Sequence, residues 1–338
     1  MNETEQKYNS ALLPDEVRSA LEREHAADER QPSPTPQKSG KLPKSVVAVV
    51  VGCLVLNFLM MTTVAVLFVV RRNQEKAVET SVAEVSVDEH EGEIHIVDDV
   101  LGDIWIPEYT NIEKSTVLTD KIVEQNGFKS YTAGSVPSKV GMDVSEFQTV
   151  TDWDAVKAAG VEYVMIRVGR RGYESGQIVE DTEFRRNIEG ALAAGLPVGV
   201  YFFSQAVTPG EARLEANFVL EKIADYDITY PIAFDWERVE EMDARTYGIQ
   251  NDQLTALARE FANVIRANGY TPMLYFYKHL GYLQYDLSRL SGYDFWLAEP
   301  ADKPSFYYRY TMWQYTSEGT VPGVEGTVDL NLCFEPYS

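Results

Sequence analysis

From about Lys139 to its C-terminus the chain alternates short apolar runs with helix-like segments, and this alternation is what most constrains its fold. The apolar runs predict strands at 140–145, 161–168, 197–204, 230–237, 272–277, 295–298, 310–316 and 327–333. Helical patterns at 153–159, 182–194, 208–224 and 250–268 lie between the earlier runs. Apolar strands that alternate with helices form a parallel sheet covered on both faces. About eight strands, the last three of which are joined by loops, predict an α/β fold, namely an irregular TIM-like β/α barrel.

The run at 230–237 ends in two carboxylates, Asp235 and Glu237. Because side chains alternate faces along a strand, these two acids share one face and Trp236 takes the other. A rise of about 3.3 Å per residue puts their Cβ atoms roughly 6–7 Å apart. In an apolar setting, burial and the neighbouring charge raise the pKa of one carboxyl, which then stays protonated and can act as an acid. Glycoside hydrolysis needs such an acid together with an anion, although an Asp-x-Glu also arises by chance in an acidic chain.

Two further acids lie near the strand ends at which a barrel places its active site. Asp143 is near the end of the first expected strand, and Asp329 is on the last one, which is expected to close beside the first. Together with Asp235 and Glu237 they predict an acidic cluster, with Asp143 among the catalytic residues and Asp329 among the substrate-binding ones. The alternatives are a turn former or helix cap at Asp143 and an ordinary loop residue at Asp329.

Aromatic residues occur on the same expected strands. Aromatic faces stack on the apolar faces of sugars, and their polar tips can bond hydroxyl groups. The expected substrate-binding aromatics are Tyr201, Tyr275, Trp296, Trp313 and Tyr315, with Tyr277 as a further candidate. Core packing is the alternative role, for about half of them. Phe202 and Trp236, at alternate positions, are the expected core packers.

The composition argues against several kinds of function. The 338 residues include 30 Lys and Arg against 52 Asp and Glu, a net charge of −22. Phosphate contact needs clustered Lys and Arg, so a nucleic-acid partner is not expected. Cys53 lies inside an apolar run and Cys333 near the C-terminus, which argues against an intrachain disulfide. The four histidines are scattered and no Cys/His cluster has zinc-ligand spacing, so no cofactor is expected.

The first 138 residues divide into three parts of different composition. Residues 1–44 are polar and end in a stretch rich in Pro, Lys and Ser, and we expect a disordered tail. Residues 45–70 contain no charge; at about 1.5 Å per residue a helix of this length crosses a hydrocarbon core of roughly 30 Å, which predicts a transmembrane helix. Residues 71–138 have the composition of an acidic stalk that gains some order near the barrel, with an Asn-Gly hairpin turn expected at 125–128.

Several short motifs occur in order from Lys139 onward. They are Gly141-Met-Asp-Val-Ser-Glu-Phe-Gln148 followed by Asp152-Trp153, Ile166-Arg-Val-Gly169, Gly199-Val-Tyr-Phe-Phe-Ser204, Asp235-Trp-Glu237, Trp313-Gln-Tyr315 and Val328-Asp-Leu-Asn331. Together these motifs resemble those of glycoside hydrolase family 25, the lysozyme-type muramidases. The resemblance covers residues 139–338 and does not extend to the tail, the uncharged run or the stalk.

The resemblance implies an irregular β/α barrel that cleaves the β-1,4 bond between N-acetylmuramic acid and N-acetylglucosamine in peptidoglycan glycan strands. By position, Glu237 is implied as the general acid and Asp235 as the group that stabilises or orients the reacting centre. Asp143 and Asp329 are implied to complete the acidic floor. Retaining, inverting and substrate-assisted routes stay open, because rotamers move the carboxylate oxygens by Ångströms; the N-acetyl groups of both sugars favour the substrate-assisted route.

The expected protein is therefore a membrane-anchored muramidase, inserted in the lipid bilayer through residues 45–70. Positive charges flank both ends of this run, so they do not decide its orientation. The expected function does: the N-terminus is expected in the cytoplasm and the catalytic barrel outside. The expected organism is a Gram-positive bacterium, whose wall lies within reach of the stalk. Two alternatives stay open. One is a wall-binding module without activity, and the other is a metal-dependent hydrolase that uses the four acids as oxygen ligands. The sequence identifies no protein partner.

Overall fold

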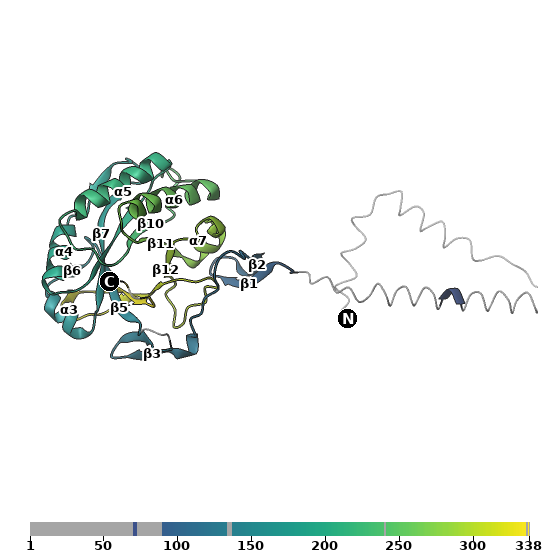
Figure 1. The fold of residues 1–338 in the computed structure, drawn as a ribbon, viewed down its shortest axis with the longest axis horizontal. Helices are drawn as coiled ribbons and strands as arrows, with labels where there is room; N and C mark the ends of the chain where they lie inside the picture. The colour runs from purple at the N-terminus through teal and green to yellow at the C-terminus, as the bar shows by residue number, and fades with distance from the viewer. Residues whose placement is uncertain (1–69, 73–89, 134–136, 240, 336, 338) are drawn as a thin grey trace, which may run out of the picture. The chain divides into compact units, whose positions relative to one another are not determined.

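The computed structural model describes residues 70–72, 90–133, 137–239, 241–335 and 337. The chain divides into two units, Met1–Val87 and Asp88–Ser338, and all the strands and helices below belong to the second. Figure 1 shows this second unit as a ring of strands with helices on its outside.

Two of the sequence predictions concern residues that the structure does not describe. They are the disordered tail at 1–44 and the transmembrane helix at 45–70, of which only Val70 is described. Within the described ranges, no helix combines the length and the hydropathy needed to cross a membrane. The tail and the span therefore stay predictions.

Eight strands of the described chain form a closed barrel. In hydrogen-bonded order they are β5 (Lys139–Val144), β15 (Val328–Cys333), β13 (Met312–Gly319), β12 (Asp294–Ala298), β11 (Pro272–Tyr277), β10 (Ile232–Trp236), β9 (Val198–Ser204) and β7 (Tyr163–Arg171). β7 pairs with β5 and closes the ring, and β8 (Ile178–Glu180) extends β7 as an edge strand. The predicted β/α barrel is confirmed.

Helices cover the outside of the barrel (Figure 1). They are α3 (Trp153–Ala159), α4 (Phe184–Ala193), α5 (Pro209–Ile223), α6 (Asn251–Ala267) and α7 (Lys278–Leu283), with 3-10 turns at η1 (Thr119–Lys121) and η2 (Leu287–Arg289). Thr208 caps α5, because its side chain accepts a hydrogen bond from Glu211 N just ahead of Pro209, as the sequence predicts. β15 runs antiparallel to both of its neighbours, which makes the barrel irregular.

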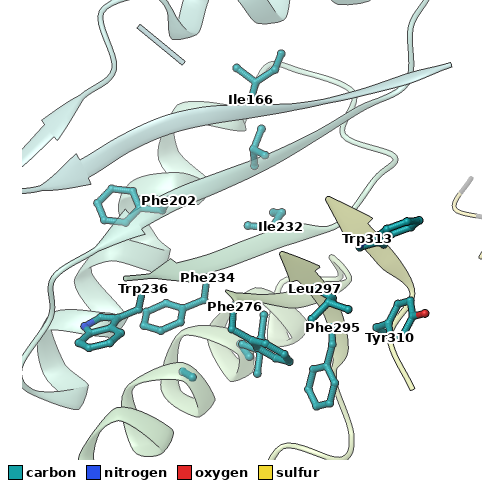
Figure 2. Packing of buried hydrophobic residues seen from close by; sticks show 14 of the residues in the cluster. Ile166, Phe202, Ile232, Phe234, Trp236, Phe276, Phe295, Leu297, Tyr310 and Trp313 are labelled. Carbon is teal, nitrogen blue, oxygen red and sulfur yellow. The ribbon is translucent and has the colours of Figure 1, made fainter. Parts of the chain in front are cut away.

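Side chains alternate between the two sides of each barrel strand, and this alternation separates two cores. Phe202, Phe234 and Trp236 belong to the outer core, between the strands and the helices (Figure 2). The two expected core packers, Phe202 and Trp236, are thus confirmed as core residues. On β10, Ala233 and Asp235 take the alternate positions and point into the barrel.

The second core fills the inside of the barrel. Its buried members are Tyr163, Met165, Tyr230, Ala233, Met273, Trp296, Met312 and Cys333. Successive inward positions change from apolar to polar towards one end: on β10 Ala233 precedes Asp235, and on β13 Met312 precedes Gln314. This polar end is the carboxyl end of the parallel strands, which is where such barrels carry active sites.

Short antiparallel pairs lie outside the barrel. They are β1 (Glu93–Asp98) with β2 (Gly102–Pro107), β3 (Ile122–Gln125) with β4 (Phe128–Tyr131), and β6 (Thr149–Val150) with β14 (Val324–Glu325). The hairpin turn predicted at 125–128 is confirmed. Asn126 and Gly127 have φ angles of 55° and 81°, the positive pair that a type I′ turn requires.

Residues 90–133 fold against the barrel over a longer stretch than a stalk ordered only near its end implies. Ser115 N donates to Tyr307 O at 2.8 Å, and the ring of His279 lies 2.9 Å from the carboxylate of Asp98. The acidic residues of the segment favoured the prediction of a stalk over that of a folded segment. Every second residue of β1 is nevertheless buried, which gives the hairpin an apolar face.

Candidate active site

Asp143 and Asp329 lie side by side in the structure. They are Cα partners in the register of β5 and β15, with Asp143 buried and Asp329 half-buried. Gln314 Nε2 donates to Oδ2 of both acids, at 2.9 and 3.2 Å. Asn331 Nδ2 donates to the same Oδ2 atom of Asp143 at 2.7 Å. Side-chain amides therefore satisfy much of the hydrogen-bonding capacity of these two carboxylates.

The two amides are themselves fixed in orientation. Tyr275 OH donates to Gln314 Oε1 at 2.9 Å, and Trp296 Nε1 donates to Asn331 Oδ1 at 2.8 Å. Because each amide oxygen accepts one of these bonds, each amide N–H group faces the acids. Sequence reasoning missed Gln314 and Asn331 as site residues. The available signal was spacing, since Asn331 stands two residues after Asp329 and therefore on the same strand face.

The acidic cluster is contacted by hydrogen-bond donors, which bear on whether it could bind a metal ion. The amide N–H groups of Gln314 and Asn331 point at the oxygens that an oxygen-ligated ion needs. Over the described ranges, no three His, Cys, Asp or Glu side chains are arranged as ligands of a metal ion.

Asp235 lies on the inward side of β10 with 4% of its surface exposed. Its Oδ1 atom is buried and has no hydrogen-bond partner among the described residues. Burial raises the pKa of this carboxyl well above its usual range, and the charges of Glu237 and Asp143 raise it further, while Arg167 opposes them. An enclosed polar atom without a partner costs free energy, and a ligand N–H at this point removes that cost.

Glu237 is the first residue after β10 and is half-buried at the mouth of the barrel. Burial raises the pKa of its carboxyl above the ordinary glutamate value of 4.5, and the charge of Asp329 raises it further. Burial likewise raises the pKa values of Asp143 and Asp329. Crowded acids in an apolar setting do not all ionise together, so the cluster keeps protons at a pH where isolated carboxyls lose them.

Three of the predicted aromatics meet beside these acids, since Tyr275 is the Cα partner of both Asp235 and Trp296. The ring of Trp296 packs edge-on against Tyr201 and Tyr275, with ring centres 6.0 and 4.9 Å apart. Trp296 is buried, whereas the two tyrosines are half-buried. The tyrosines can therefore face a ligand, while the buried tryptophan packs against both of them.

Trp313 and Tyr315 do not join this group, which corrects their expected place in the site. They flank the inward-facing Gln314, so the alternation of the strand turns both of them to the outside of the barrel. Trp313 Nε1 donates to Glu299 O at 2.9 Å, and Tyr315 OH accepts a bond from Lys129 N at 3.4 Å. Both rings pack in the outer core, because three consecutive strand residues cannot share one face.

Arg167 is a cation beside the acidic cluster that sequence reasoning also missed. Its Nε donates to Asp181 Oδ2 at 2.7 Å, and its Nη2 donates to Glu146 Oε1 at 2.9 Å. The guanidinium lies 4.9 Å from the ring centre of Phe147, which is 77% exposed. Because Arg167 lowers the pKa of Asp235, it favours the ionised form of that carboxyl. The signal in the sequence was a basic residue within the apolar run at 161–168, in which Glu162 is the only other charged residue.

An Asp235→Asn substitution is expected to stabilise the fold at pH 7 by on the order of 1–3 kcal/mol. A buried acid whose pKa is raised contributes its full stability only below its unfolded value, near 3.8, and loses it as pH rises through the folded pKa. The neutral amide avoids this loss. Thermal unfolding measured from pH 3 to pH 8 should therefore give two melting curves that differ by a few degrees at pH 7 and converge below pH 3.8.

Asp181→Asn is the matched control for this prediction. Asp181 is equally enclosed, but it is ion-paired with Arg167. Its amide variant should be less stable than the parent at pH 7, because the buried guanidinium loses one of its two carboxylate partners and keeps only Glu146. An Asp235→Asn protein that is also destabilised at pH 7 would contradict the description of Asp235 as an unsatisfied carboxyl.

The chain is similar in sequence to known lysozymes. The autolytic lysozyme of Clostridium acetobutylicum is 29% identical over 192 residues, which are 56% of this chain and 54% of that protein. Lysozyme M1 of Streptomyces globisporus is 26% identical over 202 residues, which are 56% of this chain and 66% of that protein. The chain therefore matches between about half and two thirds of the length of these curated relatives.

Solved structures share the fold. The modular autolysin LytC from Streptococcus pneumoniae, in complex with a synthetic peptidoglycan ligand, has a TM-score of 0.51 at 23% identity, over 72% of this chain and 56% of that chain. A family 25 glycosyl hydrolase from Bacillus anthracis has a TM-score of 0.50 at 20% identity, over 59% of this chain and 89% of that chain. At these identities the likeness concerns the fold alone.

The family is identified from the sequence. The sequence model of the glycosyl hydrolases family 25 matches residues 142–324, which is more than half of the chain. The matched region contains Asp143, Asp235 and Glu237, and Asp329 lies five residues beyond it. The resemblance drawn from the motifs is confirmed, and the chain belongs to the glycosyl hydrolases of family 25.

Proposed function

We propose that this chain is a muramidase, which hydrolyses the β-1,4 bond between N-acetylmuramic acid and N-acetylglucosamine in peptidoglycan. The observation that carries the proposal is the pair of carboxyls at the end of β10. Asp235 is enclosed with an unpartnered oxygen, and Glu237 stands at the mouth with a raised pKa. Membership of family 25 and similarity to proteins named lysozymes support the same activity.

Glu237 is the general acid of this reaction. Its raised pKa favours the protonated form of the carboxyl, which a general acid requires. The proton passes to the glycosidic oxygen as the bond between this oxygen and C1 of the muramic acid residue breaks, and the glucosamine side leaves as an alcohol. Positive charge develops at C1, and the neighbouring acids stabilise it.

Asp235 orients the N-acetyl group of the same muramic acid residue in a substrate-assisted route. Its unpartnered Oδ1 accepts the amide N–H, and the acetyl oxygen forms a bond to C1 as the leaving oxygen departs. Glu237, now a carboxylate, takes a proton from water, whose oxygen attacks C1 and opens the ring intermediate. Glu237 ends protonated again, and two displacements at C1 leave the configuration unchanged.

The remaining residues of the site hold the sugar and the cluster. Asp329 is half-buried and can accept a sugar hydroxyl, while Tyr201 and Tyr275 offer aromatic faces to the sugar ring. Asp143 already accepts bonds from two amides, one of them from Gln314, so its role is to fix the floor of the site.

Digestion of purified peptidoglycan by the full-length protein should release fragments with muramic acid at the new reducing end, as identified by mass spectrometry. Glu237→Gln should lower the rate by about 10²–10⁴-fold, because the amide has no proton to give to the leaving oxygen. Glu260→Gln is the matched control. Glu260 lies on α6 outside the barrel, paired with Arg213, and its variant should cleave at the parental rate.

Other outcomes of this digestion would overturn parts of the proposal. Fragments that end in glucosamine would leave the family and the site in place but change the bond that is cut. A parent protein that binds peptidoglycan and releases nothing would replace the enzyme with a wall-binding module. Activity that disappears in EDTA and returns with a divalent cation would favour a metal-dependent hydrolase instead.

We also propose that residues 45–70 anchor the enzyme in the cell membrane, with the N-terminus in the cytoplasm and the barrel outside. The support comes from the sequence and from the substrate. The run is free of charge and long enough to span, and peptidoglycan lies outside the membrane. A Gram-positive bacterium fits this arrangement, because its wall lies within reach of a barrel held at the membrane surface.

Protease added to intact cells from which the wall has been removed should digest the barrel. A cytoplasmic protein must survive in the same cells, as the control for intact membranes. Survival of the barrel while a known external domain is digested would overturn the orientation. Recovery of the undigested protein in the soluble fraction after cell lysis would overturn the anchor.

A further inference from the structure

Strand pairing around β10 stops just short of Glu237. The register between β9 and β10 runs from Val200 and Ile232 to Ser204 and Trp236, and it ends there. On the other side of β10 the register with β11 ends still earlier. Glu237 follows Trp236, so the sheet supplies no backbone partner for its carbonyl oxygen. The proposed general acid thus stands on the first residue that the barrel itself does not hold.

The side chain of Gln205 supplies the missing contact. Gln205 is the residue after Ser204, beyond the last pair of β9 and β10. Its Nε2 donates to the backbone O of Glu237 at 3.0 Å, and its side chain is completely buried. One side-chain amide therefore extends the ladder by one step, to the residue whose side chain is proposed to transfer a proton.

The other end of the same amide is also held. Thr246, which is itself buried, donates its Oγ1 hydrogen to Gln205 Oε1 at 2.6 Å. Because the amide oxygen accepts this bond, the N–H group is directed at Glu237. The backbone O of Gln205 accepts a further bond from Arg245 Nη1 at 3.3 Å.

Arg245, the residue before Thr246, makes two further contacts with other parts of the fold. Arg245 Nη2 pairs with Glu211 Oε1 of α5 at 2.6 Å, and Arg245 N donates to Tyr173 O at 2.9 Å. Glu237 and Thr246 therefore both form hydrogen bonds with the side chain of Gln205. Glu237, Arg245 and Thr246 are thereby tied to the end of β9, to α5 and to the loop after β7.

We infer that Gln205 is a positioning residue for the general acid. It fixes the backbone of Glu237, and with it the direction from which the carboxyl meets the glycosidic oxygen. The inference rests on the role proposed for Glu237. Gln205 bonds to the main chain and to Thr246, so it acts through Glu237 and does not touch the substrate. A misplacement of a catalytic group by about 1 Å can cost roughly 10²-fold in rate.

Gln205→Met removes both amide contacts while it keeps the length of the side chain. The full-length variant, assayed on a soluble tetrasaccharide of alternating N-acetylglucosamine and N-acetylmuramic acid, should show a kcat about 10–100-fold below the parent with KM within about threefold. Gln253→Met is the matched control. Gln253 also donates its amide to a backbone carbonyl, that of Val207, but away from Glu237, and its variant should keep the parental kcat.

The pH profile separates positioning from a general loss of folded protein. The general acid must be protonated in order to act. Burial and the charge of Asp329 raise the pKa of Glu237, and Asp235 is a second acid whose charge interacts with this carboxyl. Release of Glu237 towards solvent lowers that pKa. The basic limb of kcat/KM should therefore move to lower pH in Gln205→Met, whereas partial unfolding lowers the activity at every pH without moving the limb.

A folded Gln205→Met protein with parental kcat and an unmoved basic limb would overturn the inference. A parent that fails to cleave the tetrasaccharide would overturn the proposed function instead, so the two failures are distinguishable. If Gln205→Met does not fold, Thr246→Val decides. This variant keeps the bond to Glu237 but leaves the amide free to rotate, and a kcat lowered by about threefold is expected. An unchanged kcat in a folded Thr246→Val protein would then overturn the inference.

Discussion

The two-residue alternation of side chains along the barrel strands decides where chemistry can occur in this protein. Inward positions near the amino ends of the parallel strands carry tyrosine and methionine side chains that fill the barrel. Nearer the mouth, the same inward faces carry Asp143, Asp235 and Asp329. These carboxyls share a space that is closed by apolar side chains below, and burial there raises all three pKa values above their ordinary range. The closed sheet is therefore what raises the pKa values of these acids above those of exposed carboxyls.

Within this space the acids differ in their partners, and the differences suit them to different roles. Asp143 accepts bonds from two side-chain amides, both at its Oδ2 atom, and is held in place by them. Asp235 keeps an enclosed oxygen without a partner, which suits a group that orients a ligand N–H. Glu237 lies beyond the strand, where the side chain of Gln205 donates a hydrogen bond to its backbone carbonyl. Because the strand ends before Glu237, this residue can approach a ligand, and for the same reason its backbone depends on one buried amide.

Local patterns in the sequence predicted the barrel, the cap of α5 and the Asn-Gly hairpin, because each depends on residues close together in the chain. The supporting shell of the site was not predicted. Gln314 and Asn331 matter because β13, β15 and β5 are neighbours in the sheet, and a strand read alone does not show its neighbours. The wrong prediction for Trp313 has a local cause. Its alternation with Gln314 was visible in the sequence, but Trp313 was predicted to bind substrate because aromatic residues stack on sugars.

In the proposed substrate-assisted route, Glu237 transfers a proton to the glycosidic oxygen, and Asp235 orients the N-acetyl group that acts as the nucleophile. Proton NMR of the first product from a soluble tetrasaccharide, recorded before mutarotation, measures the configuration at the new reducing end. An attack by the acetyl oxygen followed by water makes two displacements at C1, so the β-anomer should appear first. An α-anomer as the first product would mean a single direct displacement by water, and it would contradict the role given to Asp235.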